Sequence, residues 1–246
     1  MAIERLSALS RLTSYGMFLT VWATSSPAGL IVDPVTPVFS GTGLGNQLTI
    51  LTLLETGGPP TGMASGCVTR VGAMDSIGGC GAPYNGGNEL MGASQTLTRS
   101  FGDIGWNGPQ DIGVVFNAGE PGGDSINLDN LSLLFFQPDG TFFFEAALLA
   151  PQTFMDTDTG VGSSGFLFSL DPAQQTSLLP LFTSLGSPGN RVGAGMSVSD
   201  AEGAPETLFA INLQRSVVIP EPASLLLVGS GLLGLLALAR RRWSNN

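Results

Sequence analysis

Short apolar segments, separated by clusters of Gly, Pro, Asn and Asp, run through the chain from residue 29 to residue 219. The segments are rich in β-branched residues, Leu and Phe, and each is too short to cross a membrane as a helix. This pattern is typical of all-β proteins, so we expect a body built as a two-sheet sandwich or jelly roll. The predicted strands are 37–41, 48–54, 67–71, 96–101, 112–117, 125–136, 141–149, 164–170, 191–199 and 207–214.

The clearest turn lies between the segments 131–136 and 141–149, where the sequence reads Gln137-Pro-Asp-Gly140. Proline fixes φ at the first turn position and glycine accepts the left-handed conformation. We therefore expect a β-hairpin here. Both of its strands are nearly continuous apolar runs, which predicts that the hairpin is central and covered on both faces.

One short helix is predicted after Asp171, which can cap a helix whose first residue is Pro172. Gln174 lies three residues after the cap, the position from which its side chain can close a capping box. Pro180 is expected to end this helix.

The chain contains no His, and its nine basic residues are all Arg, so it has no Lys either. These absences exclude Ser-His-Asp and Cys-His catalysis, HExxH zinc sites and Schiff-base chemistry. All of the 19 acidic residues except Glu4 and Glu221 lie in the body, against four arginines: Arg70, Arg99, Arg191 and Arg215. Such a surface repels nucleic acids and anionic lipids, so no nucleic-acid partner is expected.

Cys67 and Cys80 are the only cysteines of the chain. In an exported protein an even number of cysteines favours a disulfide, here closing the loop 67–80. Two thiolates without a nearby histidine do not complete a tetrahedral metal site. We therefore expect a disulfide.

The C-terminal residues combine three elements in order: Pro220, Glu221 and Pro222, an uncharged apolar run at 223–239, and Arg240, Arg241 and Arg242. A helix of that length is at the short end of what spans a bilayer. The arginines that follow it predict a cytoplasmic C-terminus and a body on the other side of the membrane. A buried core helix is the alternative.

This order resembles the PEP-CTERM sorting signal of Gram-negative bacteria, and the resemblance covers residues 217–246. It implies that the tail is recognised by an exosortase, an integral-membrane enzyme that acts near the Pro-Glu-Pro motif. It also implies passage through the inner membrane, a final location at the cell surface or in the extracellular matrix, and association with exopolysaccharide or biofilm. The body, residues 29–216, resembles uncharacterised exported β-rich proteins that carry this signal.

A sorting tail requires earlier export, so residues 1–28 are predicted to be a signal peptide. Arg5 and Arg11 supply positive charge and residues 15–23 a short apolar core, while 21–23 and 26–28 both offer a cleavage site. Glu4 weakens this pattern. An uncleaved anchor and a misplaced start codon remain alternatives.

Calcium is the candidate cofactor. Asp156 and Asp158, followed by Gly160, begin like a calcium loop, but Leu167 stands where an EF-hand needs an acidic residue, so an ordinary turn is the simpler interpretation. A second candidate is the group formed by Asp124, Asp129 and Asn130. The segment 128–131 there resembles strands of jelly-roll carbohydrate-binding modules. The alternation of apolar residues changes phase at Asn130, which equally predicts a β-bulge.

Catalysis, if any, would use carboxylates, as glycoside hydrolases do. The candidate pairs are Asp200 with Glu202 and Asp156 with Asp158, but a body this rich in acids produces such pairs by chance. Tyr84 and Trp106 lie in predicted loops, where an aromatic ring either stacks on a sugar or is buried under the loop.

The sequence thus predicts a non-enzymatic protein of the cell surface or matrix, sorted by its C-terminal signal. The alternative is a carbohydrate-binding or calcium-dependent adhesive module, and a carboxylate-based glycoside hydrolase is a third hypothesis.

Overall fold

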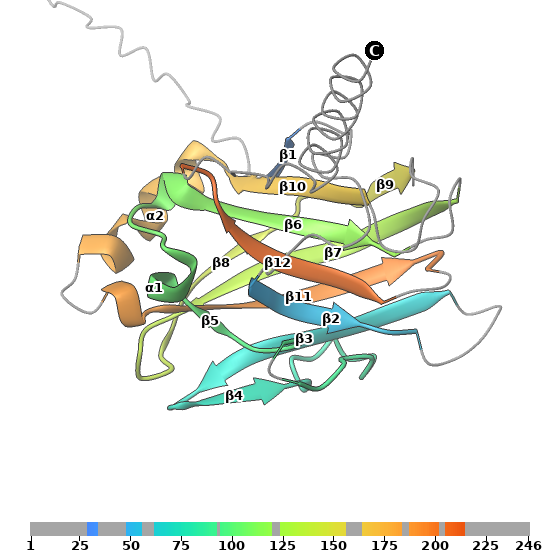
Figure 1. Ribbon diagram of the computed structural model, residues 1–246, viewed down its shortest axis with the longest axis horizontal. Coiled ribbons are helices and arrows are strands. Elements are labelled where there is room, and N and C mark those ends of the chain that lie inside the picture. The colour runs from blue at the N-terminus through green and yellow to red at the C-terminus, as the bar shows by residue number, and fades with distance from the viewer. Residues whose placement is uncertain are drawn as a thin grey trace, which may run out of the picture.

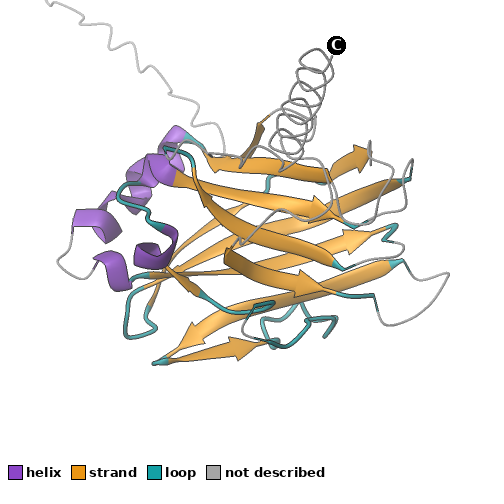
Figure 2. Ribbon diagram, viewed as in Figure 1, coloured by secondary structure: helices purple, strands orange, loops and turns teal. Residues whose placement is uncertain are grey.

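The computed structural model describes residues 29–33, 48–55, 62–92, 94–119, 124–155, 164–183, 187–201 and 205–214. They form two antiparallel sheets that pack face to face, with the helices gathered at one end of the sandwich (Figures 1 and 2). The predicted two-sheet, all-β architecture is confirmed. Within this part of the chain, no helix is long and apolar enough to span a membrane, and the predicted span at 223–239 lies outside it.

The first sheet has five strands in the order β1-β10-β6-β12-β2. Their bounds are β1 Leu30–Asp33, β2 Leu48–Leu53, β6 Ile112–Ala118, β10 Ser164–Leu170 and β12 Glu206–Asn212. The second sheet has the order β4-β3-β11-β7-β8, with β5 paired to β11 and β9 paired to β7. Its strands are β3 Met63–Val71, β4 Met74–Ile77, β5 Arg99–Ser100, β7 Ser125–Phe136, β8 Phe142–Ala147, β9 Gln152–Met155 and β11 Arg191–Ser199.

Large apolar side chains fill the space between the sheets because alternate residues of each strand point inward. Phe116, Phe166 and Phe168 come from the five-stranded sheet, and Phe135 and Phe154 from the seven-stranded one. All five side chains are fully buried. They form one continuous core.

Strand β11 crosses the middle of the seven-stranded sheet and has small residues on its outer face. Val192, Ala194, Met196 and Val198 belong to the core, so the residues between them point outward. These outward residues are Gly193, Gly195 and Ser197. The outer face therefore has a low strip along β11 that other segments can approach closely.

The predicted hairpin is confirmed: the Gln137 N–H donates to the Thr141 carbonyl over 2.9 Å, and Gly140 has φ 86°. Its predicted central position is half wrong. Strand β7 lies inside the sheet, but β8 is at its edge, where Phe142 is 54% exposed. A continuous apolar run does not distinguish a covered strand from an edge strand that exposes some of its apolar side chains.

Helix α2, Pro172–Thr183, starts as predicted, with the Asp171 Oδ1 atom accepting from the Gln174 N–H over 2.7 Å. The capping-box prediction is wrong, because the buried Gln174 Oε1 atom accepts no hydrogen bond among the described residues. Pro180 does not end the helix and lies inside it. Since Thr176 and Pro180 are both exposed, water can bond the Thr176 carbonyl that proline leaves without a donor.

The strand predicted at 96–101 is largely wrong. Only Arg99–Ser100 pairs as β5, and helix α1 begins at Phe101 and ends at Ile104. Ser100 caps this helix by accepting from the Asp103 N–H, and Gly105 ends it in the left-handed conformation. Two short 3-10 turns, Pro109–Asp111 and Ser187–Gly189, complete the helical end. The strand predicted at 37–41 lies outside the described residues.

Candidate functional site

A loop that follows β4, residues 78–91, is fastened to strand β3. Its first anchor is the predicted disulfide, which is confirmed: Cys67 and Cys80 are bonded, with 6.3 Å between their Cα atoms. Its second anchor is Glu89, whose Oε1 atom accepts from the Cys67 N–H over 2.7 Å. The loop is thus held at both of its ends.

Between these anchors the loop lies directly on the low strip of β11. A Cβ atom on Gly195 would meet the ring of Tyr84 at 2.7 Å, so glycine is needed for the ring to lie there. Further along, the Gly86 N–H donates to the Ser65 Oγ atom over 2.9 Å. The loop and the outer face of the sheet therefore form one surface.

Two cavities of about 330 Å³ each open where the loop meets the sheet. The two cavities share Pro83 and Asn130 as lining residues, so we treat the cavities as one groove with two halves. The first half is also lined by Cys80, Ala82, Tyr84, Leu131, Ser132, Leu134, Glu145, Ala147 and Leu148. The second half is also lined by Met63, Ala64, Ser65, Gly86, Asn88, Asp129, Ser197 and Val198.

The first half contains a chain of three polar side chains. Ser132 donates to the Glu145 Oε1 atom over 2.5 Å, and its Oγ atom lies 2.7 Å from the Tyr84 hydroxyl. Because a serine hydroxyl has one proton, Tyr84 is the donor to Ser132. Ser132 is 1% exposed and serves as the link, whereas Glu145 is exposed and also lines this half of the groove.

The second half is shaped by a β-bulge in β7. Ser197 pairs with Asn130 but Val198 pairs with Leu128, which leaves Asp129 as the extra residue. The phase change at Asn130 thus marks a bulge, as one interpretation of the sequence predicted. The side-chain amide nitrogen of Asn130 donates to the Ser197 Oγ atom over 2.9 Å, and the side-chain oxygen of Asn130 and the Asp129 carboxylate are acceptors in this half.

Burial raises the pKa of Tyr84 above its usual value of 10.0. The hydrogen bond to Ser132 opposes this shift, and the negative charge of Glu145 adds to it. The neutral phenol is therefore the form that the folded groove stabilises. This stabilisation is complete below pH 10.0 and is lost as the pH rises through the higher pKa of the folded state.

Absorbance can test this directly, because the chain has two tyrosines, Tyr15 and Tyr84. In full-length Tyr15→Phe protein, the midpoint of the rise in tyrosinate absorbance should lie at a pH above 10.0, and in urea the midpoint should return to that value. Gly195→Ala, which displaces the ring, should move the folded midpoint back toward the ordinary value. A folded midpoint at or below 10.0 would show that Tyr84 is not desolvated.

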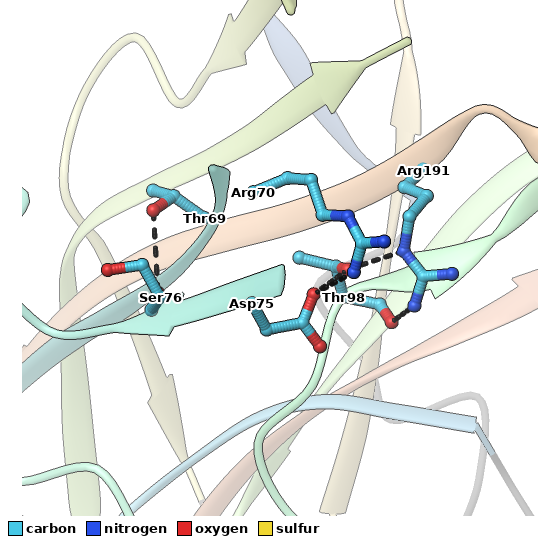
Figure 3. A network of polar contacts seen from close by, with 6 residues as sticks. All are labelled: Thr69, Arg70, Asp75, Ser76, Thr98 and Arg191. Atoms are coloured by element: carbon cyan, nitrogen blue, oxygen red, sulfur yellow. Dashed lines mark hydrogen bonds and ion pairs between the residues drawn. The ribbon is translucent and has the colours of Figure 1, made fainter. Parts of the chain in front are cut away.

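The arginines of the described residues gather elsewhere, at one corner of the sandwich. Figure 3 shows Arg70 and Arg191 converging on Asp75 and Thr98. Arg70 forms an ion pair of 2.9 Å with Asp75, and the Arg191 Nε atom donates to the Thr98 hydroxyl over 2.6 Å. Arg99 donates to the Thr49 carbonyl over 2.5 Å.

This arginine corner is a structural junction. Thr98 is fully buried and also donates to Asp75. The hydrogen bond from Arg191 of β11 and the hydrogen bond of Arg99 to Thr49 of β2 thus connect the segment before α1 to both sheets. Burial lowers the pKa of Arg191, and the nearby charge of Arg70 lowers it further. Burial likewise lowers the pKa of Arg99. None of these arginines lines the groove, which leaves the groove acidic.

The other predicted aromatic, Trp106, is not a binding residue. It is 3% exposed and its Nε1 atom donates to the Ile211 carbonyl over 2.8 Å, so it belongs to the core. Asp200 is also occupied: it has φ 57° and accepts from Asn127 over 2.5 Å. Asp124 lines neither half of the groove.

Several predicted site residues lie outside the described residues. They are Asp156, Asp158, Glu202, Pro220, Glu221, Pro222, Arg240, Arg241 and Arg242. The calcium site and the paired-carboxylate sites therefore stay predictions. Over the part of the chain that the structure describes, no three His, Cys, Asp or Glu side chains are grouped as metal ligands.

Sequence reasoning named Tyr84, Asp129 and Asn130 but missed Glu145 and Ser132. Ser132 and Glu145 come together through the register of β7 with β8. This register pairs Ser132 with Ala147 and Leu134 with Glu145, so Ser132 and Glu145 are diagonal neighbours. The signal in the sequence was a polar residue at an alternate position of each apolar strand of the hairpin.

Comparison with known proteins concerns the C-terminus. Residues 218–242 match the model of the PEP-CTERM protein-sorting motif. No curated protein and no solved structure matches the chain, so the resemblance of the body to other exported proteins stays a prediction. The chain therefore carries a PEP-CTERM sorting motif, which supports exosortase-dependent sorting of an exported protein through the membrane.

Proposed function

We propose that this protein is a non-catalytic component of the cell surface or extracellular matrix that associates with exopolysaccharide. The observation that carries the proposal is the PEP-CTERM motif at residues 218–242. In this proposal the apolar run 223–239 holds the protein in the inner membrane until an exosortase acts near Pro220, Glu221 and Pro222. Arg240 to Arg242 keep the C-terminus in the cytoplasm.

Two properties of the body support this location. The Cys67–Cys80 disulfide suits an oxidising compartment outside the cytoplasm. The acidic surface, without a single lysine, suits a solvated protein that does not adhere to anionic lipid. The absence of His and Lys also removes the commonest catalytic groups, which supports a non-catalytic role.

The sorting motif is tested by Glu221→Ala expressed in the native host. We expect processing to stop, because this substitution removes the only charged side chain of the Pro-Glu-Pro motif. The unprocessed chain should then remain in the inner-membrane fraction, which immunoblotting of fractionated cells would detect. Glu120→Ala, the same chemical change in the body, should be processed like the wild type.

Normal processing and surface location of Glu221→Ala would contradict the sorting role. The association with exopolysaccharide has its own readout. In a host that lacks exopolysaccharide synthesis, the processed protein should leave the matrix fraction and appear in the medium. Retention in that fraction would overturn this part of the proposal and leave the sorting role intact.

A further inference from the structure

We propose that the groove between the loop 78–91 and the outer face of the seven-stranded sheet binds a neutral oligosaccharide. This inference rests on the proposed association with exopolysaccharide and names both the contact surface and the class of ligand. It requires neither calcium nor the residues outside the described part of the chain.

The dimensions and stiffness of the groove suit a chain-like ligand. Each half, at about 330 Å³, lies at the lower end of the range for small-molecule sites. Because Pro83 and Asn130 line both halves, a linear ligand can lie across them with one unit in each. The disulfide and the contact of Tyr84 with Gly195 hold the loop in place before any ligand arrives, which lowers the entropic cost of binding.

The polar groups of the groove match sugar hydroxyls, which both donate and accept hydrogen bonds. Glu145, Asp129 and the carbonyl oxygen of Asn130 accept. The hydroxyl of Ser197 accepts from Asn130, so its own proton is available to a ligand oxygen. Leu134, Ala147, Leu148 and Pro83 add apolar surface for the C–H faces of the sugar rings.

The charge of the groove selects against anionic ligands. Asp129 and Glu145 are its ionisable carboxylates, and no arginine lines it. The described arginines are held in the arginine corner by hydrogen bonds, as Figure 3 shows for Arg70 and Arg191. Uronate-rich or phosphorylated chains would therefore be repelled, and neutral sugars would not.

The strands beneath the groove also argue against an extended peptide as the ligand. Strand β11 is paired with β3 and β7, and β7 is paired with β11 on one side and with β8 and β9 on the other. β11 and β7, the two central strands of the floor, thus offer no free edge to which a peptide backbone can add, and the edge strand β8 lines the groove through Glu145 and Ala147.

The test uses the full-length protein in detergent and an array of neutral hexasaccharides with β-1,4-glucan, β-1,3-glucan, xylan and mannan linkages. Uronate hexasaccharides and extended peptides are included for comparison. We expect saturable binding of at least one neutral hexasaccharide, unchanged by a calcium chelator. Isothermal titration with that sugar should show at least about tenfold weaker binding for the double variant Asp129→Ala, Glu145→Ala, because both charged acceptors are lost.

Ala147→Trp, which fills the first half of the groove, is the second variant and should weaken binding even if the double variant unfolds. Asp124→Ala removes an exposed acid that lies outside both halves and should bind like the wild type. Circular dichroism establishes which variants are folded.

If the folded groove variants bind the sugar as tightly as the wild type does, the groove is not the binding site. The proposed matrix role would then still stand. Preference for uronates or peptides, or an absence of binding to every neutral sugar, would also overturn the proposed binding of a neutral oligosaccharide in the groove. Release of shorter sugars from the array would contradict the non-catalytic role. Retention of the processed protein in the matrix fraction of a host without exopolysaccharide, by contrast, would count against the proposed function and not against sugar binding in the groove.

Discussion

Phe101→Ala should lower the free energy of unfolding by roughly 3–5 kcal/mol, the usual cost of truncating a fully buried phenylalanine. The Phe101 side chain is 0% exposed and packs against three other aromatic rings. Its ring centroid lies 4.9 Å from that of Phe182, 5.5 Å from Trp106 and 6.1 Å from Phe135. Because protein cores are close-packed and relax only partly after truncation, we expect a cavity to remain.

Urea unfolding followed by tryptophan fluorescence measures this change, and Phe142→Ala is its matched control. Phe142 is 54% exposed, and its ring centroid lies 5.9 Å from that of Phe136, so its loss should cost less than about 1 kcal/mol. Equal effects of the two substitutions would mean that the aromatic cluster around Phe101 does not stabilise the helical end of the sandwich.

Removing the disulfide with Cys67→Ala and Cys80→Ala together should lower the free energy of unfolding by about 3 kcal/mol. The two cysteines are 13 positions apart, and the bridge restricts the loop between them in the unfolded chain. Alanine is the suitable replacement because Cys67 is 0% exposed and serine would bury a hydroxyl there. The midpoint of urea unfolding gives the change.

The same loss should follow when dithiothreitol reduces the wild type, while the double variant should not respond to it. The loop 78–91 would keep its Glu89 anchor, so the variant should retain the β-sheet signal of the native protein in circular dichroism. A midpoint that reduction does not change would show that the bridge leaves stability unaffected.

Long apolar runs made most of the sandwich predictable. The bounds predicted for 125–136, 164–170 and 191–199 agree with those of β7, β10 and β11. Each of these runs is flanked by turn residues, and alternate side chains of each run pack in the core. The bonded pair Cys67 and Cys80 was predictable from composition and spacing.

Short elements were not predictable, because tertiary contacts decide them. Strand β4 is four residues long and exists through its pairing with β3, including the ion pair of Arg70 with Asp75. Phe101 looks like a strand residue by propensity, yet the cap at Ser100 and the aromatic contacts place it in a helix. Pro180 is tolerated in α2 because that face of the helix is exposed.

The candidate groove was predictable only in fragments. Tyr84, Asp129 and Asn130 drew attention as single residues, but the sequence does not reveal that they share a groove with Glu145. That juxtaposition depends on a bulge and on a glycine strip under the loop, both of which follow from strand register.

The position of β12 in its sheet has a mechanical consequence for a tethered protein. This strand ends at Asn212, eight residues before Pro220, a length of chain that reaches at most about 29 Å. If the sorting motif is held at the membrane, as we propose, the folded body must stay within that reach, and any pull on the connecting chain acts on β12. Because β12 is hydrogen-bonded to β6 on one side and to β2 on the other, the load is shared by two ladders of hydrogen bonds. In the proposed anchored state, the body would be held by an interior strand of its five-stranded sheet.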